Sequence, residues 1–141
     1  ADAVDVDAIA VEPAYQELAA LLGTRLKRRS VICLVTDVVD EAGATALARS
    51  LVGLRQRHAV IVVALADATL RQLATPDDAD DNDTTLRRRA AQQLLAHRRR
   101  ALQLLERSAV VVDVDDDGAD GHGAGSAAVA AWWRLKQAGR V

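Results

Sequence analysis

The chain has 141 residues and a formal net charge of −2, and half of its residues are hydrophobic. This length suits one domain with a single core. The near-neutral charge argues against a protein whose whole surface grips nucleic acid or anionic lipid, because such binding needs many unopposed cations.

Cysteine usage and hydropathy set two further limits. The lone Cys33 excludes an intrachain disulfide and a cysteine-based zinc site, and it favours a reducing, cytoplasmic compartment. No apolar run approaches the ~20 residues of a membrane-spanning helix, so we expect no membrane insertion by this segment. The absence of Met, even at position 1, leads us to expect a piece of a longer chain.

The first predicted elements are a helix and a strand. Apolar residues recur at steps of three or four from Tyr15 to Leu26, behind Pro13, which suits a first helical turn. Residues 31–35, VICLV, form a short run rich in β-branched side chains. This run predicts a strand that is buried on both faces.

The middle of the chain repeats this alternation. Asp40 is placed to cap a helix whose apolar side continues to Leu54. Residues 59–66, AVIVVALA, predict a second buried strand. The Asp-rich stretch that begins at Thr75 predicts a polar loop, because it has charge to repel and nothing to bury.

The last third predicts a long helix over about 83–107, a strand at 109–112 and a closing helix at 126–138, with Gly139 as its stop. Strands that alternate with helices are typical of crossover units on a parallel sheet. We therefore predict a Rossmann-like α/β fold with a parallel sheet of about three to four strands flanked by helices.

An aspartate follows each predicted strand, at Asp37, Asp67 and Asp113. The carboxyl ends of parallel strands meet at one edge of a sheet, where open α/β folds bind ligands, so the three carboxylates should gather there. Hard oxygen ligands favour Mg²⁺ or Ca²⁺ over zinc. An aspartate after a strand is also a common helix cap, and we favour capping for Asp67 and Asp113. Asp37 precedes the better-placed cap Asp40, so it is the strongest site candidate.

Four segments of the sequence carry a family resemblance: KRRSVICLVTDVVDEAGATALARSL, RQRHAVIVVALADATLRQLA, LRRRAAQQLLAHRRRALQLLERSAVVVDV and AAWWRLKQAGRV. Together they resemble the carboxy-terminal half of the bacterial family called domain of unknown function 58, which is similar to von Willebrand factor A domains. The resemblance covers about 11–141. It implies that 1–141 is a single α/β domain and that the first half of the fold lies upstream.

The resemblance also implies a metal-ion-dependent adhesion site. In the family this site uses a DxSxS loop, a threonine from a later loop and the aspartate of a strand-terminal Thr-Asp pair. Only that pair matches here, as Thr36 and Asp37, and Ala14 stands where many relatives carry an aspartate. The resemblance therefore implies at most a weak, incomplete Mg²⁺ site.

The implied function is a non-enzymatic protein-interaction module. The resemblance implies a link to MoxR-type AAA+ ATPases, a chaperone-like or assembly role, and a parent protein anchored in the membrane upstream. Without the upstream half, the strand at 31–35 should expose an unpaired edge. Three things could cover this edge: the rest of the parent chain, a second copy in a homo-oligomer, or a strand at 4–11. The partner-binding candidates are Asp67, Asp113 and Trp133, because Trp132 and Trp133 cannot both point inward on one helix.

Two other function classes are alternatives. A metal-dependent phosphotransfer module of the receiver type also gathers acids at strand ends, but Lys27 and Lys136 do not stand where its lysine is needed. The arginines at 87–89 and 98–100 invite a nucleic-acid interpretation of the long helix. The overall charge favours a solvated face or an acidic partner, so we expect no nucleic acid.

Three smaller expectations complete the analysis. Arg87 and Arg98 project from the apolar side of the long helix and should snorkel or pair with acids. Residues 113–118, DVDDDG, copy half of a calcium loop, but Ala124 stands where the bidentate glutamate belongs, so a solvated loop is favoured. His58 lacks the neighbouring ligands of a zinc site.

Overall fold

The computed structural model describes residues 14–38, 40–76, 82–114 and 123–139. The helices are α1 (Tyr15–Arg25), α2 (Glu41–Arg57), α3 (Ala68–Ala74), α4 (Asn82–Glu106) and α5 (Gly123–Gln137), and the strands are β1 (Val31–Thr36), β2 (Ala59–Leu65) and β3 (Val110–Val114). The strand considered at 4–11 and most of the solvated loop predicted from Asp113 lie outside these residues.

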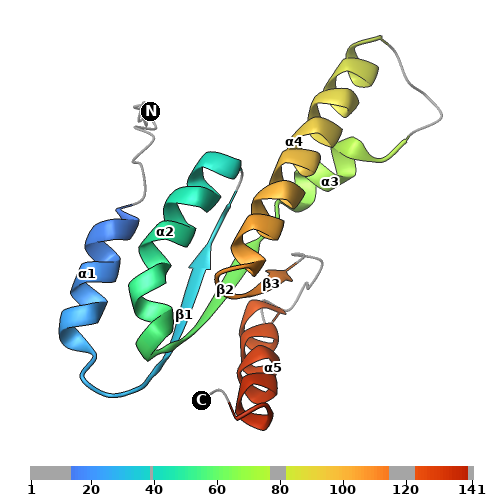
Figure 1. Cartoon of the computed structure of the whole chain (residues 1–141). Coiled ribbons are helices and arrows are strands. Elements are labelled where there is room, and N and C mark those ends of the chain that lie inside the picture. Colours follow the sequence, from blue (N-terminus) through green and yellow to red (C-terminus); the bar gives the residue numbers. More distant parts are fainter. Residues whose placement is uncertain (1–13, 39, 77–81, 115–122, 140–141) are drawn as a thin grey trace, which may run out of the picture.

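The described strands form one parallel sheet in the order β1-β2-β3 (Figure 1). Each strand is reached through at least one helix, which the parallel direction requires. This confirms the predicted α/β class with a helix-flanked parallel sheet, and the layout is Rossmann-like.

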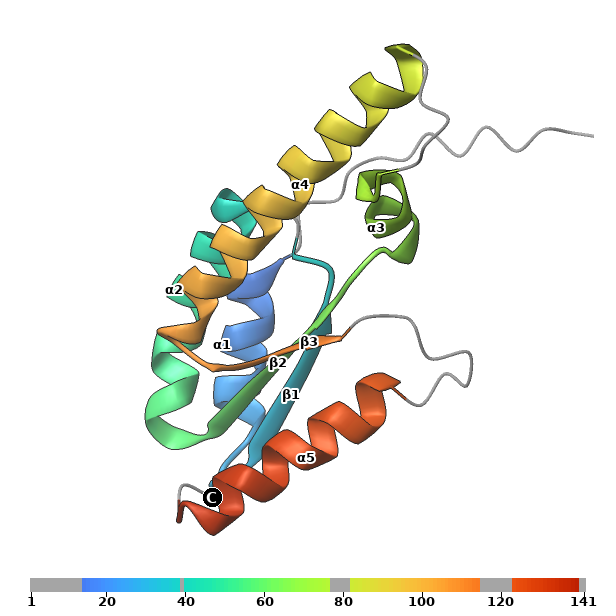
Figure 2. The same cartoon turned by 90° about the vertical axis from the view of Figure 1, so that its right-hand side faces the viewer.

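Helices cover the two faces of the sheet unequally. Helices α1, α2 and α4 lie on one face and α5 lies on the other, as Figure 2 shows. Helix α3 packs on α4. Since side chains alternate along a strand, Val60 and Val62 of β2 pack in the first core while Ile61 and Val63 pack under α5. None of the described helices is long and apolar enough to cross a membrane.

Helix ends follow the sequence signals. Asp40 caps α2, with its Oδ1 accepting a hydrogen bond from the Gly43 N–H at 2.7 Å. Gly139 follows α5 with φ +65°, a conformation that glycine adopts without steric cost. Helix α3 was not predicted, and α5 begins at Gly123, ahead of the predicted start at 126.

One prediction about burial was wrong. The run VICLV was expected to be buried on both faces, yet Cys33 is exposed and Val35 is 54% exposed. Helix α5 packs on β2 and β3, and only Val31 at the start of β1 reaches its core, so no described element covers Cys33 and Val35. The neighbouring Val63, which pairs with Val35 in the register, is 0% exposed.

That contrast makes a matched test of the fold. Val63→Ala should lower the free energy of unfolding by about 2–3 kcal/mol, because two methyl groups leave a closed core and a cavity remains. Val35→Ala, on the adjacent strand, should cost less than about 1 kcal/mol. Urea unfolding followed by circular dichroism measures both values, and equal losses would contradict the exposure of β1.

Candidate functional site

The candidate site lies where the strands end, and the register brings its residues to one edge. Thr36 pairs with Ala64, and Ala64 pairs with Asp113, so these residues form a row across the sheet. Asp37 follows directly after this row on β1, and Asp67 follows β2. Neighbouring strands lie about 4.8 Å apart, so β1 and β3 are separated by about 10 Å at this edge. The prediction that the strand ends gather at one edge is confirmed.

Asp113 is held by an arginine from α4. Arg98 Nη2 donates to Asp113 Oδ1 at 2.8 Å and also to the carbonyl oxygens of Leu65 and Ala64, at 2.9 and 3.3 Å. The Arg98 side chain is only 10% exposed, whereas Asp113 is 47% exposed. The expectation that Arg98 pairs with an acid is confirmed, and the pair fastens α4 to the ends of β2 and β3. Asp113 lies within β3, one residue before its end, and the next described helix begins only at Gly123. The prediction that it caps a helix was therefore wrong, because its carboxylate pairs with Arg98 instead.

Asp67 serves as a helix cap. Its Oδ1 accepts a hydrogen bond from the Thr69 N–H at 2.8 Å at the start of α3. The capping interpretation, which the sequence favoured, is confirmed for this residue. Capping leaves part of the exposed carboxylate able to contact a partner.

Asp37 differs from the other two aspartates. Its side chain is exposed, and among the described residues it has no hydrogen-bond or ion-pair partner. The adjacent Thr36 hydroxyl shares a hydrogen bond of 3.3 Å with the hydroxyl of Tyr15, which brings the start of α1 to the end of β1. Asp37 is therefore the carboxylate at this edge that serves no visible structural purpose.

The described residues do not fit a magnesium site. No group of three or more His, Cys, Asp or Glu side chains in the described ranges could hold a metal ion. Mg²⁺ requires near-octahedral oxygen ligation, and Thr36 with Asp37 supplies only a fraction of it. The Mg²⁺ expectation thus rests on the family resemblance alone.

The exposed face of β1 was not predicted from the sequence. Within the described part of the chain, β1 is hydrogen-bonded to β2 on one side and to nothing on the other. The open edge was expected, but the exposure of Cys33 and Val35 on its face was not. A run of apolar residues does not indicate whether a helix packs on it.

Trp133 is 51% exposed on α5, while Trp132 packs in the core beneath that helix. The expectation that one tryptophan is buried and the other exposed is confirmed. The Lys136 ammonium lies 5.2 and 5.4 Å from the two ring centroids, within the range of a cation–π contact. Trp133 belongs to α5, which lies on the same side of the sheet as Cys33 and Val35 (Figure 2).

Some of the residues invoked for the alternative functions form ion pairs, and the two lysines lie far from Asp37. On α4, Arg87 pairs with Asp83 at 2.8 Å, and Arg100 lies 3.7 Å from Glu41. Lys27 precedes β1 and Lys136 is near the end of α5, so both lie toward the opposite edge of the sheet from Asp37. No described feature favours a receiver-type site or a nucleic-acid face on α4.

Comparison with family models, with curated proteins and with solved structures found no match to this chain.

The roles of the aspartates at this edge can be separated by stability. Asp40→Ala should lower the free energy of unfolding by about 1 kcal/mol through the loss of the α2 cap. Asp37→Ala should change it by less than about 0.5 kcal/mol. Urea unfolding of both variants measures these free energies. A loss of stability in Asp37→Ala as large as that in Asp40→Ala would show that Asp37 has a structural role.

The Arg98 pair permits a second matched comparison. Arg98→Met should destabilise the protein by about 2 kcal/mol, because Asp113 and two strand-end carbonyls lose a charged donor. Arg99→Met alters the exposed neighbour on the same helix and should be nearly neutral. Thermal unfolding of the two variants measures the difference. Similar unfolding temperatures would contradict the proposal that Arg98 holds α4 to the strand ends.

Proposed function

We propose that this chain is a non-enzymatic protein-interaction module that binds a partner along the open edge and the uncovered face of β1. The observation that carries the proposal is the contrast between Val35, 54% exposed, and its register partner Val63, 0% exposed. Among the described strands β1 also has a hydrogen-bonded neighbour on one edge only. An unpaired strand edge is a template for another chain.

The partner contributes an extended segment. An edge strand offers unpaired N–H and C=O groups to a peptide that adds to the sheet, while exposed side chains select what packs on it. Cys33 and Val35 offer an apolar surface. Asp37, at the end of the same strand, adds a carboxylate without a partner among the described residues. The partner segment should therefore be apolar along β1 and carry a basic side chain beside Asp37.

The remaining partner candidates extend this surface. Asp67 and Asp113 lie at the same edge of the sheet as Asp37, and Trp133 lies on α5 on the same side as Cys33. Exposed tryptophan is favoured at interfaces because it buries a large apolar area. We propose these residues as secondary contacts around β1.

The family assignment belongs to this proposal. The helix-flanked parallel sheet supports a von Willebrand factor A-like half-domain, and the open edge of β1 supports a fold that continues in other polypeptide. A MoxR-type AAA+ ATPase as the partner rests on the sequence resemblance alone, as does a metal-ion-dependent adhesion site completed by upstream residues.

Cys33 provides the test, because it is the only cysteine of the chain and lies exposed on the proposed surface. A photoreactive benzophenone maleimide on Cys33 should form one adduct with a partner protein in a lysate of the source cells. Val35→Lys should abolish the adduct, because a charge on an edge strand opposes strand addition. Leu86→Lys, at an exposed position on α4, should leave it intact.

Two results would contradict the proposal. The first is an adduct that persists in Val35→Lys, or that forms equally from a probe moved to Leu86→Cys in a Cys33→Ala background. The second is an adduct made of two copies of this chain, which would replace the partner protein by self-association.

A further inference from the structure

The sheet has a strongly basic edge where its strands begin, at the opposite end of the strands from Asp37. The three strands begin there, and α1, α2 and α4 end there. The exposed cations gathered at this edge are Arg25, Lys27, Arg28, Arg29, Arg55, Arg57, Arg107, Arg134 and Lys136. Among the described residues Glu106 is the one carboxylate in their midst. The net charge of −2 conceals this separation of charge.

Helix dipoles explain part of the cluster. Cations in a last helical turn offset the partial negative charge of the free carbonyl groups, which accounts for Arg25 of α1 and Arg57 of α2. Lys27, Arg28 and Arg29 lie outside any helix. The basic edge therefore holds more positive charge than helix ends require.

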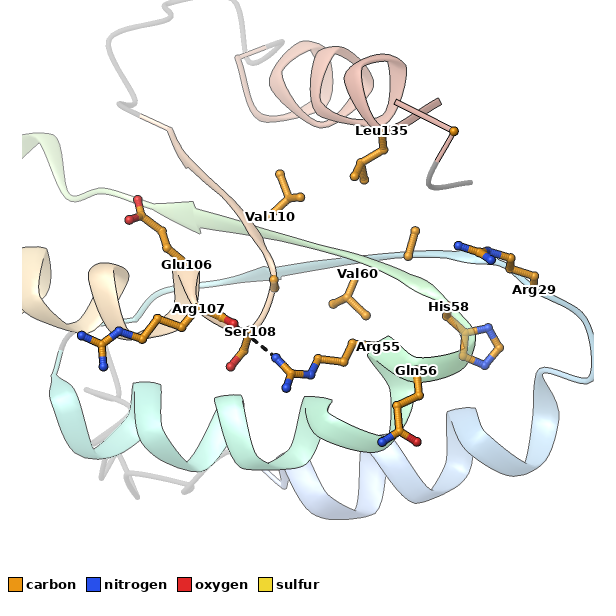
Figure 3. Close-up of a pocket in the computed structure, with 13 residues that line it drawn as sticks. Arg29, Arg55, Gln56, His58, Val60, Glu106, Arg107, Ser108, Val110 and Leu135 are labelled. Carbon is orange, nitrogen blue, oxygen red and sulfur yellow. Dashed lines mark hydrogen bonds between the residues drawn. The ribbon is translucent and has the colours of Figure 1, made fainter. Parts of the chain in front are cut away.

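A cavity of about 620 Å³ opens within this basic edge. Its polar lining includes Arg29, Arg55, Arg107 and Ser108, and its apolar lining comes from the starts of β2 and β3 and from α5. Figure 3 shows Arg29 at the start of β1 and Arg55 at the end of α2, with the Arg55 side chain turned toward Ser108 and the carbonyl group of Arg107. A volume of this size matches pockets that take small organic ligands.

Arg55 retains binding capacity in this arrangement. Its Nη1 donates to the carbonyl oxygen of Arg107 at 3.2 Å, which helps to end α4. A guanidinium group carries five N–H donors in a planar fork that matches phosphate and carboxylate oxygens. One contact therefore leaves most of the fork for a ligand.

His58 adds a buried donor beside the cavity. The residue is 4% exposed, and its Nδ1 accepts a hydrogen bond from the Ser30 N–H at 3.3 Å. A neutral ring then carries its proton on Nε2, which is buried and has no partner among the described residues. An unsatisfied buried donor is costly, and because Nε2 is closed off from solvent, a ligand oxygen would reach it only after the surrounding side chains move.

We infer that this cavity binds an anion of the phosphate class that carries an apolar body. The arginines that line the cavity, Arg29, Arg55 and Arg107, supply the positive charge that attracts its oxygens, and the partly buried Val110 contacts the rest of the ligand. The site lies at the opposite edge of the sheet from Asp37 and does not depend on the proposed protein partner.

Calorimetric titration with pyrophosphate tests the inference, with sodium chloride at equal ionic strength as the blank. The intact chain should bind, and Arg55→Gln and Arg29→Gln should each weaken binding about tenfold or more, through loss of a charge-assisted contact. Arg49→Gln removes an exposed arginine from the same helix as Arg55, away from the cavity, and should bind like the intact chain.

A nucleoside diphosphate, which carries the same two phosphates, tests the apolar part of the inference. Tighter binding than pyrophosphate would support a contact between the nucleoside and the apolar lining, and equal binding would overturn that part. No heat above the salt blank with either compound, or an equal loss in Arg49→Gln and Arg55→Gln, would overturn the inference. Circular dichroism verifies that each variant is folded, and the Arg29 variant keeps the test valid if Arg55→Gln unfolds.

Discussion

The structure depends on β2, which is the one described strand that is paired on both sides and covered on both faces. Its residues from Ala59 to Ala64 are all buried. Alternate side chains enter two separate cores, one under α2 and α4 and the other under α5. Because both cores share this strand, it fixes the positions of β1 and β3 and of the helices around them.

The parallel direction of the strands divides the molecule chemically. All strand ends point to one edge, where Asp37, Asp67 and Asp113 lie, and all strand starts point to the other, where the arginines gather. A net charge near zero argues against binding of polyanions over the whole surface, yet it does not describe either edge. The two proposed sites use these edges separately: a protein segment along β1 toward Asp37, and an anion among the arginines.

Much of the fold could be predicted because local signals were consistent. Runs such as AVIVVALA predict strands, Asp40 predicts a cap, and alternation with helices predicts a parallel sheet. Helix α3 escaped prediction because seven residues are too few for a periodic pattern. The burial of β1 was predicted wrongly because VICLV resembles the buried run of β2, and the coverage of each strand is decided by where α5 packs.

The candidate site was only partly predictable for the same reason. The sequence could indicate that Arg98, on an apolar helix face, needs an acid, but only the folded chain identifies Asp113. His58 lacks any ligand motif, and its contact with Ser30 spans 28 residues of sequence. Tertiary contacts also bring Arg29 and Arg55 to one cavity, and no spacing in the chain links them.

Residue-resolved amide hydrogen exchange of the full chain tests the central position of β2 and the open edge of β1 most directly. In a parallel pair, alternate amides of an edge strand bond to the neighbour and the others point outward. We expect slow exchange throughout β2 and an alternation of slow and fast amides along Val31–Thr36. Uniformly slow exchange along β1 would mean that its outer edge is already paired, and it would contradict this account.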